Sequence, residues 1–416
     1  MAGVLCAAFS GAWADDAAPW VAQGLFVWSQ ESNLLRFSDA EVASGLTTSD
    51  TARTARLSLG WHPRWGRQRL NAELALGRQQ FSRFSLYNHD EHDLHLGWDW
   101  QTADHLSGAI QAHDLQHLSQ LRPYGIGLLT VPNLESTQQV QALARWGLAS
   151  TMGLEASLEG RRVEYSAQQA RADDYHQHTA GLAWRSAPSA AMMWGLGLRA
   201  TQGRYPHRFE ALTSARNDDA YQGRFVDLIL QWMPEAGRSP HQWEGRLSIG
   251  RTSYDVDTSR NVSGLFGRVR WLWQPLAGLH LDTEWTREPG QDAYFATLVA
   301  PAAEVRGSAP AAVAPIEAAR LTHKLQLMAS ADVTAKTQVQ LGAGTVRRSL
   351  AGIIATPPLA AGQDRSESVR LGFQWQPARQ VRLNCAWEHE RREGEAPWSS
   401  SWRNRTTTCQ GQLTLK

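Results

Sequence analysis

The chain has 416 residues and a nearly balanced charge, with 41 Lys and Arg against 40 Asp and Glu. This balance removes the electrostatic argument for a dedicated nucleic-acid-binding protein. The apolar fraction of 42% is too high for a disordered chain, and no apolar run is long enough to predict a membrane-spanning helix. The 19 Trp residues outnumber the 10 Phe and the 8 Tyr, and such large amphipathic rings are useful at a membrane interface.

The first 14 residues, MAGVLCAAFSGAWA, are small and apolar and end in Ala12-Trp13-Ala14. They resemble the hydrophobic region and cleavage site of a secretory signal peptide, although the basic residues that normally precede such a region are missing. The sequence therefore predicts a signal peptide over residues 1–14 and a single domain over residues 15–416. An ordinary disordered N-terminus is the alternative.

The dominant pattern along the chain is a two-residue alternation of apolar and polar side chains, which is typical of strands with one apolar and one polar face. Leu57, Leu59 and Trp61, for example, alternate with Ser58 and Gly60. With an ambiguous first segment included, the alternating segments predict about 18 strands: 21–34, 57–61, 70–76, 94–100, 106–112, 140–146, 152–158, 180–184, 192–198, 226–232, 247–249, 265–273, 279–285, 321–327, 339–343, 369–375, 381–387 and 413–415.

The connections between these segments alternate between short and long. Short connections carry turn residues, as at 63–66, 101–104, 186–189, 274–277 and 376–379. Long connections are polar and irregular, as at 117–134, 203–220 and 288–316. The pattern predicts an all-β fold, a transmembrane antiparallel β-barrel with short periplasmic turns and long extracellular loops in the outer membrane of a Gram-negative bacterium.

Many of the Trp residues stand just before a short turn, which predicts a ring of Trp near the periplasmic interface. The members of this predicted ring are Trp61, Trp100, Trp146, Trp184, Trp232, Trp273 and Trp375. From Trp61 to Trp273 their spacing of roughly 40 residues also matches the repeat of a β-propeller. Because each period holds two long strands and one long loop rather than four short strands, the hairpin repeat of a barrel is favoured.

The polar phase of the strands, which faces the lumen of a barrel, is rich in arginine. Guanidinium groups bind carboxylates and phosphates in a bidentate manner, so these residues are candidates for a track that binds an acidic polymer. The candidates are Arg56, Arg69, Arg145, Arg161, Arg199, Arg246, Arg268, Arg270, Arg370 and Arg382, with Lys324 beside them. The alternative is a solvated wall of ion pairs, because the same phase carries Glu73, Asp93, Asp99, Glu155, Glu159, Asp227, Glu244, Asp282, Glu284 and Glu388.

Cys385 and Cys409 are equally distant from the centre of the last hairpin, near Pro397. They are therefore expected to lie opposite each other, and a cross-strand disulfide that fastens the closing hairpin is expected in an oxidising periplasm. The alternative is two small apolar cysteines that face lipid.

The sequence predicts no metal site, no cofactor and no enzyme activity. The residues 89–93, with His113, Asp114 and His117, form the densest group of metal-like ligands, but consecutive strand residues point to opposite faces. No G-x-S-x-G motif and no evident Ser-His pairing is found, and nothing resembles a phosphate-binding loop or a dinucleotide-binding motif.

The first 120 residues carry a family resemblance. The segments QESNLLRF at 30–37, SDT at 49–51, RLNAEL at 69–74, FSLYN at 84–88, LGWDW at 96–100 and LSG at 106–108 resemble the outer-membrane β-barrel proteins of exosortase-associated exopolysaccharide loci, the EpsL-like family. The resemblance implies a component of exopolysaccharide biosynthesis or export. It assigns no catalytic or ligand residues.

The combined expectation is a passive outer-membrane channel for a polysaccharide made inside the cell. Its expected partners are the polysaccharide, outer-membrane lipids and a periplasmic export protein, without nucleic acid. Two alternatives remain open from the sequence: a surface lectin that anchors polysaccharide through its long loops, and a porin for small solutes.

Overall fold

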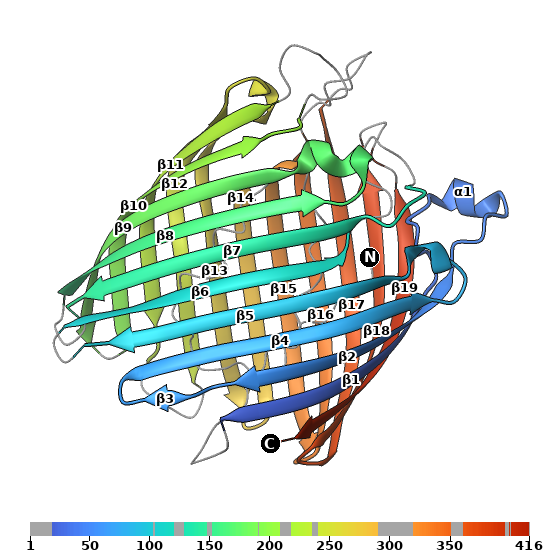
Figure 1. Ribbon diagram of the computed structural model, residues 1–416, viewed down its shortest axis with the longest axis horizontal. Helices are drawn as coiled ribbons and strands as arrows, with labels where there is room; N and C mark the ends of the chain where they lie inside the picture. The colour runs from blue at the N-terminus through green and yellow to red at the C-terminus, as the bar shows by residue number, and fades with distance from the viewer. Residues whose placement is uncertain are drawn as a thin grey trace.

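The protein is described here by a computed structural model that covers residues 19–102, 105–119, 129–147, 152–189, 191–208, 218–234, 240–289, 319–350, 361–395, 399 and 401–415. The described residues form one closed antiparallel β-barrel (Figure 1). The predicted signal peptide at 1–14 and most of the long connection at 288–316 lie outside the described residues.

The strands of the barrel are β1 (Trp20–Glu31), β2 (Asp50–Trp61), β3 (Arg64–Trp65), β4 (Gln68–Phe81), β5 (His89–Gln101), β6 (Leu106–Leu118), β7 (Leu134–Trp146), β8 (Met152–Tyr165), β9 (Tyr175–Ser189), β10 (Met192–Tyr205), β11 (Asp219–Trp232), β12 (His241–Tyr254), β13 (Val262–Leu276), β14 (Leu279–Pro289), β15 (Ala319–Thr334), β16 (Thr337–Leu350), β17 (Gly362–Ala378), β18 (Val381–Gly394) and β19 (Trp402–Leu415). The connections hold the short helical turns α1 (Asp39–Ala43), η1 (Ser85–Tyr87), η2 (Gln168–Asp173) and η3 (Thr258–Arg260). Among the described residues, no helix is long and apolar enough to cross a membrane.

Each long strand pairs with its neighbours in sequence, and β19 pairs with β1 from Leu415 opposite Ala22 to Thr406 opposite Glu31. This last pairing closes the sheet and leaves no free edge, which is the condition for a sheet that crosses a membrane. The two-residue strand β3 only extends the hairpin between β2 and β4, so the described wall has 18 long strands, as predicted.

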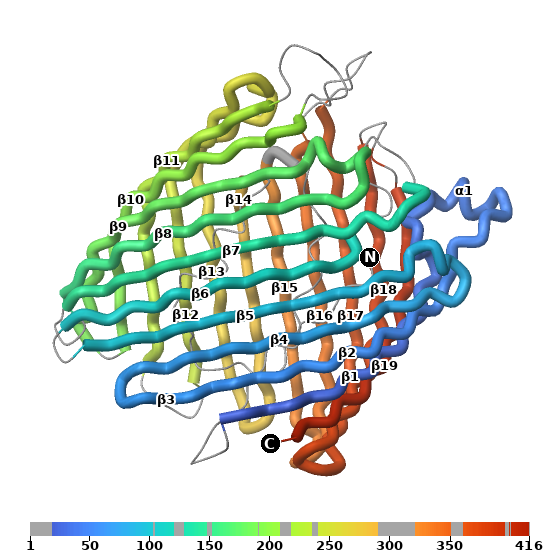
Figure 2. Tube along the Cα trace, in the orientation of Figure 1, coloured from blue at the N-terminus to red at the C-terminus, as the bar shows by residue number. Residues whose placement is uncertain are grey.

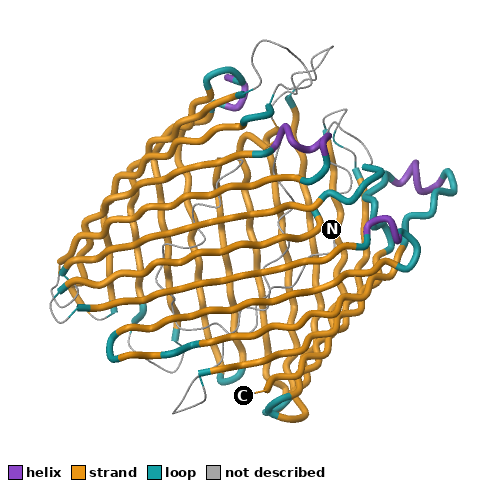
Figure 3. The backbone as a smooth tube through the Cα atoms, in the orientation of Figure 1, coloured by secondary structure: helices purple, strands orange, loops and turns teal. Residues whose placement is uncertain are grey.

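The short and long connections lie at opposite ends of the barrel, as the sequence predicts. The chain trace in Figure 2 places the tight turns, the start of β1 and the end of β19 at one end. Figure 3 shows the helical turns at the other end, among the longer connections. In an outer-membrane barrel the end with short turns faces the periplasm and the end with long loops faces the outside.

The apolar phase of the strands faces outward. Leu57 is 67% exposed and Ile249 is 68% exposed, whereas the inward-facing Phe266 on β13 is fully buried. Exposed apolar side chains recur in this way on successive strands around the barrel, and such a continuous apolar band is typical of a surface covered by lipid. The outward face is therefore the lipid-facing surface of a membrane barrel.

The strands are longer than the alternating segments that predict them. The segment 247–249, for example, becomes β12, which runs from His241 to Tyr254. At its loop end the outward positions hold the polar residues Arg251 and Ser253, so the apolar alternation ends while the backbone ladder to β11 continues to Tyr254.

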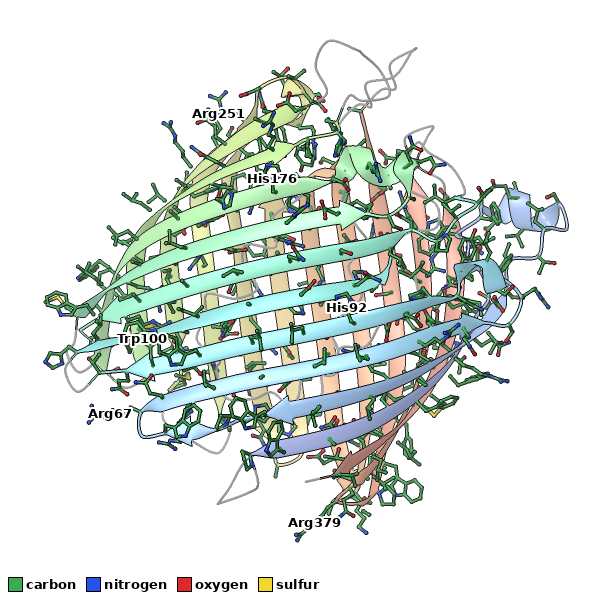
Figure 4. The ribbon with its side chains drawn as sticks, in the orientation of Figure 1. Arg67, His92, Trp100, His176, Arg251 and Arg379 are labelled. Atoms are coloured by element: carbon green, nitrogen blue, oxygen red, sulfur yellow. A yellow bond between two sulfur atoms is a disulfide. The ribbon has the colours of Figure 1, made fainter. Side chains whose placement is uncertain are left out.

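The predicted Trp ring is confirmed, because its members face outward at the end with the short turns. Trp100 is labelled there in Figure 4. Further Trp residues that the prediction omitted pack against this ring, as Trp194 does against Trp184 with ring centroids 4.8 Å apart, and Trp271 against Trp273 at 5.2 Å.

Candidate functional site: the lumen wall

The arginines predicted to face the lumen do face inward. Their neighbours in sequence, such as Leu57 beside Arg56 and Leu198 beside Arg199, are exposed on the lipid-facing side. The alternation therefore places Arg56, Arg69, Arg145, Arg161, Arg199, Arg246, Arg268, Arg270, Arg370 and Arg382 on one surface, the lumen wall. In the structure these arginines fall into separate clusters, and most of the arginines pair with carboxylates.

The first cluster is centred on Glu155 of β8, which is 4% exposed. Arg145 of β7 donates a hydrogen bond to this carboxylate from Nε at 2.7 Å, and Arg185 of β9 donates one from Nη2 at 2.6 Å. One buried carboxylate thus holds two guanidinium groups from the strands on either side. Arg185 was missed because the predicted strand ends at residue 184, one position too early.

The second cluster is centred on Asp227 of β11. Arg199 of β10 donates to Asp227 from Nε at 3.0 Å and from Nη2 at 3.3 Å, and Arg246 of β12 lies 3.7 Å away. The hydroxyl of Ser248 donates to the same carboxylate at 2.7 Å. The Arg199 side chain is only 2% exposed, so this arrangement is a buried, hydrogen-bonded ion network.

Glycine makes room for these long side chains. Gly195 faces inward on β10, where a Cβ atom would lie 3.1 Å from Cγ of Arg185 and 2.6 Å from the Trp184 carbonyl oxygen. Without a side chain at this position, Arg185 can lie flat across the neighbouring strand. The absence of a side chain at Gly195 of β10 is thus required for the packing of Arg185 in the first cluster.

The third cluster lies on β12, β13 and β14. Arg270 donates to Asp282 at 3.0 and 2.6 Å and approaches Glu244 to 3.7 Å, while Arg268 donates to Glu284 at 2.6 Å. Carboxylates outnumber arginines here, in contrast to the first two clusters. We call the wall from β7 to β14, with its three clusters, the ion-pair wall.

The other predicted arginines lie apart from the ion-pair wall or at its margin. Arg56 of β2 pairs with Asp93 at 2.8 Å, and Arg370 of β17 lies 3.8 Å from Glu388. Arg161 lies 5.8 Å from the ring centroid of Tyr175 on β9. Arg69 and Arg382 stand opposite Asp99 and Gln412 in the strand register.

A different surface follows the inward side of β15 to β19 and continues onto β1. Several of its side chains are uncharged amides, and some of these bond to one another: Gln340 donates to Gln338 at 2.9 Å, and Gln412 donates to Gln23 at 2.8 Å. We call this surface the glutamine stripe, with the members Gln326, Gln338, Gln340, Gln374, Gln410, Gln412 and Gln23. This surface was not predicted, although the repeat of Gln at alternate positions is visible in the sequence.

Tyrosines gather inside the barrel at the loop end of β8 to β12. Tyr205 is fully buried, with Tyr221 at 5.7 Å and Tyr254 at 6.5 Å between ring centroids. Arg260 of η3 stacks over this group, 4.9 Å from the Tyr205 centroid and 4.7 Å from that of Tyr254. The cluster packs the loop end of the ion-pair wall against the connection above it.

Another buried ion network lies at the loop end, in parts of β16, β17 and β18 that extend beyond the predicted strand segments. Asp364 of β17 accepts hydrogen bonds from Arg348 of β16 and from Arg392 of β18, both at 2.7 Å. Neither arginine was predicted, because both follow the point at which the apolar alternation of their strands stops. This network joins three strands where the sequence predicts loops.

Asp174 lies outside the strands, between η2 and β9. Its carboxylate accepts a hydrogen bond from the backbone N–H of Tyr165 at 2.8 Å. Burial raises the pKa of Asp174 to about 6, because the charged form loses hydration that one backbone hydrogen bond does not replace.

The metal-like residues of β5 and β6 separate onto the two faces of the wall. Asp90, His92 and Asp114 face outward, whereas Asp93 and His113 face inward and share a contact of 2.9 Å. Within the described part of the chain, no group of three or more His, Cys, Asp or Glu residues is arranged to hold a metal ion.

Cys385 and Cys409 are direct partners in the register of β18 and β19, and the structure joins them by a disulfide. They share the outward phase with Leu383, so the bridge lies on the lipid-facing side of the wall. It fastens the last hairpin and takes no part in the lumen.

Comparisons with known proteins yield likeness only at the level of three-dimensional structure. No protein-family model matches the sequence, and no curated protein matches it. Solved structures from Pseudomonas aeruginosa that resemble it include OccK5 (OpdH), at 12% identity and a TM-score of 0.45 over 95% of this chain and 98% of that one. OccK3 (OpdO) has 12% identity and a TM-score of 0.49 over 95% and 96%, and the outer membrane protein opdK has 12% and 0.48 over 95% and 99%.

The assignment of the fold rests on this chain's own strand pairing and exposed surface. A closed antiparallel barrel with an apolar outer face, a girdle of aromatic residues and a polar lumen is the architecture of outer-membrane barrel proteins. The protein is an outer-membrane β-barrel of 18 long strands.

Proposed function

We propose that the protein is an outer-membrane channel that passes a polysaccharide through its lumen. The observation that carries the proposal is the composition of the lumen wall. In Figure 1 the ion-pair wall begins on the strands at the front and continues to β14, while the glutamine stripe follows β15 to β19 at the back and reaches β1 at the front. A chain in the lumen would thus meet both paired charges and neutral amide groups.

Both surfaces suit weak contacts with a hydroxyl-rich polymer. Each glutamine amide offers two donors and an acceptor, which match sugar hydroxyls without a net charge. In the ion-pair wall the carboxylates already hold most guanidinium groups, so an acidic group on the polymer would compete for the arginines rather than be trapped by them. Conduction needs contacts that are favourable enough for entry and weak enough for exit.

The sequence resemblance to EpsL-like proteins of exopolysaccharide loci supports export as the direction of transport. On this proposal the protein needs no cofactor, and a periplasmic export protein delivers the polymer to the end with the short turns. The arginines of the ion-pair wall are proposed as contacts for acidic groups, and the glutamine stripe as the contact surface for hydroxyl groups.

The first experiment compares exopolysaccharide in the medium and in the periplasm of a strain that lacks the protein and of its parent. Loss from the medium together with periplasmic retention is the expected result. Normal secretion combined with shedding of polymer from the cell surface would contradict the proposal and favour a surface lectin.

A second experiment measures conductance of the purified protein in planar bilayers, with dextran as a neutral polymer and polygalacturonate as an acidic one. We expect an open channel whose current is interrupted by both polymers. An absence of conductance would favour the lectin, and conductance that neither polymer interrupts would favour a porin for small solutes.

A further inference from the structure

The lipid-facing surface at the loop end carries a row of basic side chains, three arginines and one histidine, on four adjacent strands. Arg287 of β14 is the register partner of His323 on β15, His323 is the partner of Arg347 on β16, and Arg347 is the partner of Arg365 on β17. All four belong to the outward phase, as their exposed neighbours Leu325 and Val369 show. The row therefore runs without interruption across the outer face of β14 to β17.

Like charges placed directly opposite each other on a sheet are destabilising. Arg365 forms an ion pair with Glu367, but Arg347 is exposed and has no ion pair among the described residues. The Nε atom of Arg287 is buried and has no hydrogen-bond partner there. Arg287 and Arg347 thus keep charges that no described carboxylate neutralises.

Two further rows of basic side chains lie on other strands of the barrel, and in the first of them Arg162 pairs with Glu164 and Arg204 pairs with Asp218. On β8 to β10, Arg162 is the register partner of His176, and His176 is the partner of Arg204. On β11 and β12, Arg224 stands directly opposite Arg251. Together these three rows form what we call the arginine girdle. Repetition on three groups of strands argues against an accident of one hairpin.

The height of the arginine girdle matches the far surface of a bilayer. Trp232 and Arg224 lie eight positions apart on β11. At about 3.3 Å per residue and a tilt of about 40°, this separation spans roughly 20 Å along the membrane normal, close to the apolar height of such barrels. Figure 4 shows Trp100 near the end with the short turns and Arg251 near the end with the loops. The girdle therefore lies at headgroup level in the outer leaflet.

We infer that the arginine girdle binds the phosphate groups of the phosphorylated glycolipid of the outer leaflet, lipopolysaccharide. A phosphate between two guanidinium groups accepts hydrogen bonds from both and converts their repulsion into attraction. Anionic headgroups are drawn to arginines at a membrane surface in the same way. Among the described residues, the outward strand positions near the Trp ring hold no arginine and are mainly apolar, with Met152, Val339 and Val381 beside the Trp and Leu residues.

The test uses the full-length barrel purified in detergent and a variant with Arg287→Gln, Arg347→Gln and Arg365→Gln. Its thermal unfolding temperature is measured with purified lipopolysaccharide, with dephosphorylated lipopolysaccharide and with inorganic phosphate. We expect only intact lipopolysaccharide to stabilise the parent, and the apparent affinity of the variant to be about tenfold weaker or more. Equal stabilisation by the dephosphorylated form, or by inorganic phosphate, would overturn the inference.

The matched control is Arg64→Gln, Arg67→Gln and Arg379→Gln, which removes the same charge from exposed turns at the other end of the barrel. This control is expected to respond to lipopolysaccharide as the parent does. An equal loss of response in control and variant would reduce the effect to net charge and overturn the proposed site.

The sign of the effect without lipid provides a second readout. In lipid-free detergent the variant is expected to be at least as stable as the parent, because it has lost the repulsion between neighbouring cations. With lipopolysaccharide the order is expected to reverse. If the triple variant does not fold, the smaller pair Arg224→Gln and Arg251→Gln is measured in the same way, and a response equal to that of the parent would contradict the girdle.

Discussion

The ion-pair wall and the glutamine stripe arise from the same alternation of residues but differ in what holds them in place. In the ion-pair wall, each buried guanidinium depends on a carboxylate of a neighbouring strand, as Arg199 depends on Asp227 at 3.0 Å. In the glutamine stripe, neutral amides bond to one another, as Gln412 does to Gln23. Loss of one partner leaves an uncompensated charge in the first surface and only an unpaired amide in the second, so the ion-pair wall is expected to tolerate such a loss less well than the glutamine stripe.

The largest difference between the two surfaces is expected in stability. Arg199→Ala removes the bidentate partner of Asp227, whose side chain is only 5% exposed, and is expected to cost about 3 kcal/mol of unfolding free energy. Gln340→Ala on the glutamine stripe is expected to cost less than about 1 kcal/mol. Urea unfolding in lipid vesicles, followed by Trp fluorescence, measures both. Equal losses would show that the pairing of charges makes no difference to the wall.

The next effect concerns the acidic polymer. The combined changes Arg246→Ala, Arg268→Ala and Arg270→Ala are expected to weaken the block of current by polygalacturonate about tenfold, through loss of charge-assisted hydrogen bonds. Block by dextran serves as the internal control and is expected to stay unchanged. If polygalacturonate blocks the variant as it blocks the parent, the arginines are not contacts for the polymer.

The reciprocal change on the glutamine stripe is expected to be smaller. Gln338→Ala, Gln340→Ala and Gln412→Ala together remove neutral hydrogen bonds, so the dwell time of dextran should fall about two- to fivefold. Polygalacturonate block is expected to change less than dextran block. An unchanged dwell time for dextran would indicate that the stripe does not touch the sugar chain.

The smallest effect is a pH dependence at the loop end of the ion-pair wall, where Asp174 caps β8. Because the folded-state pKa of Asp174, about 6, lies above the usual aspartate value of 3.8, its contribution to stability is complete below about pH 4 and is lost as the pH rises through about 6. Amide exchange at Tyr165, compared between the parent and Asp174→Asn at the same pH, measures this effect. The ratio of the two rates should change between pH 4 and pH 7, and a constant ratio would contradict the assignment.

The sequence predicts the number of strands and their phase but places their ends too early. The segment 339–343 predicts the centre of β16, which continues to Leu350. Arg348 lies in this extension, and its pairing with Asp364 was therefore missed. The alternation of apolar and polar residues stops where a strand emerges from the hydrocarbon core of the membrane. The backbone hydrogen bonds between neighbouring strands continue beyond that point into water.

The sequence predicted which arginines face the lumen but not which carboxylates pair with them. The expected inward arginines face the lumen, and the alternative that the sequence left open, a wall of ion pairs, describes most of them. The partners were not predictable, because Arg145 and Arg185 meet at Glu155 only through the register of three strands. The basic row from Arg287 to Arg365 was not predicted for the same reason, since its members are far apart in sequence.

The sequence by itself determined which residues face lipid and which face the lumen, because the two-residue period is a property of the extended backbone and needs no tertiary information. It also determined which connections between strands are short and which are long. Only the tertiary structure decided which charge meets which, because pairing across strands depends on the register, and the register is set by the turns and by closure of β19 on β1.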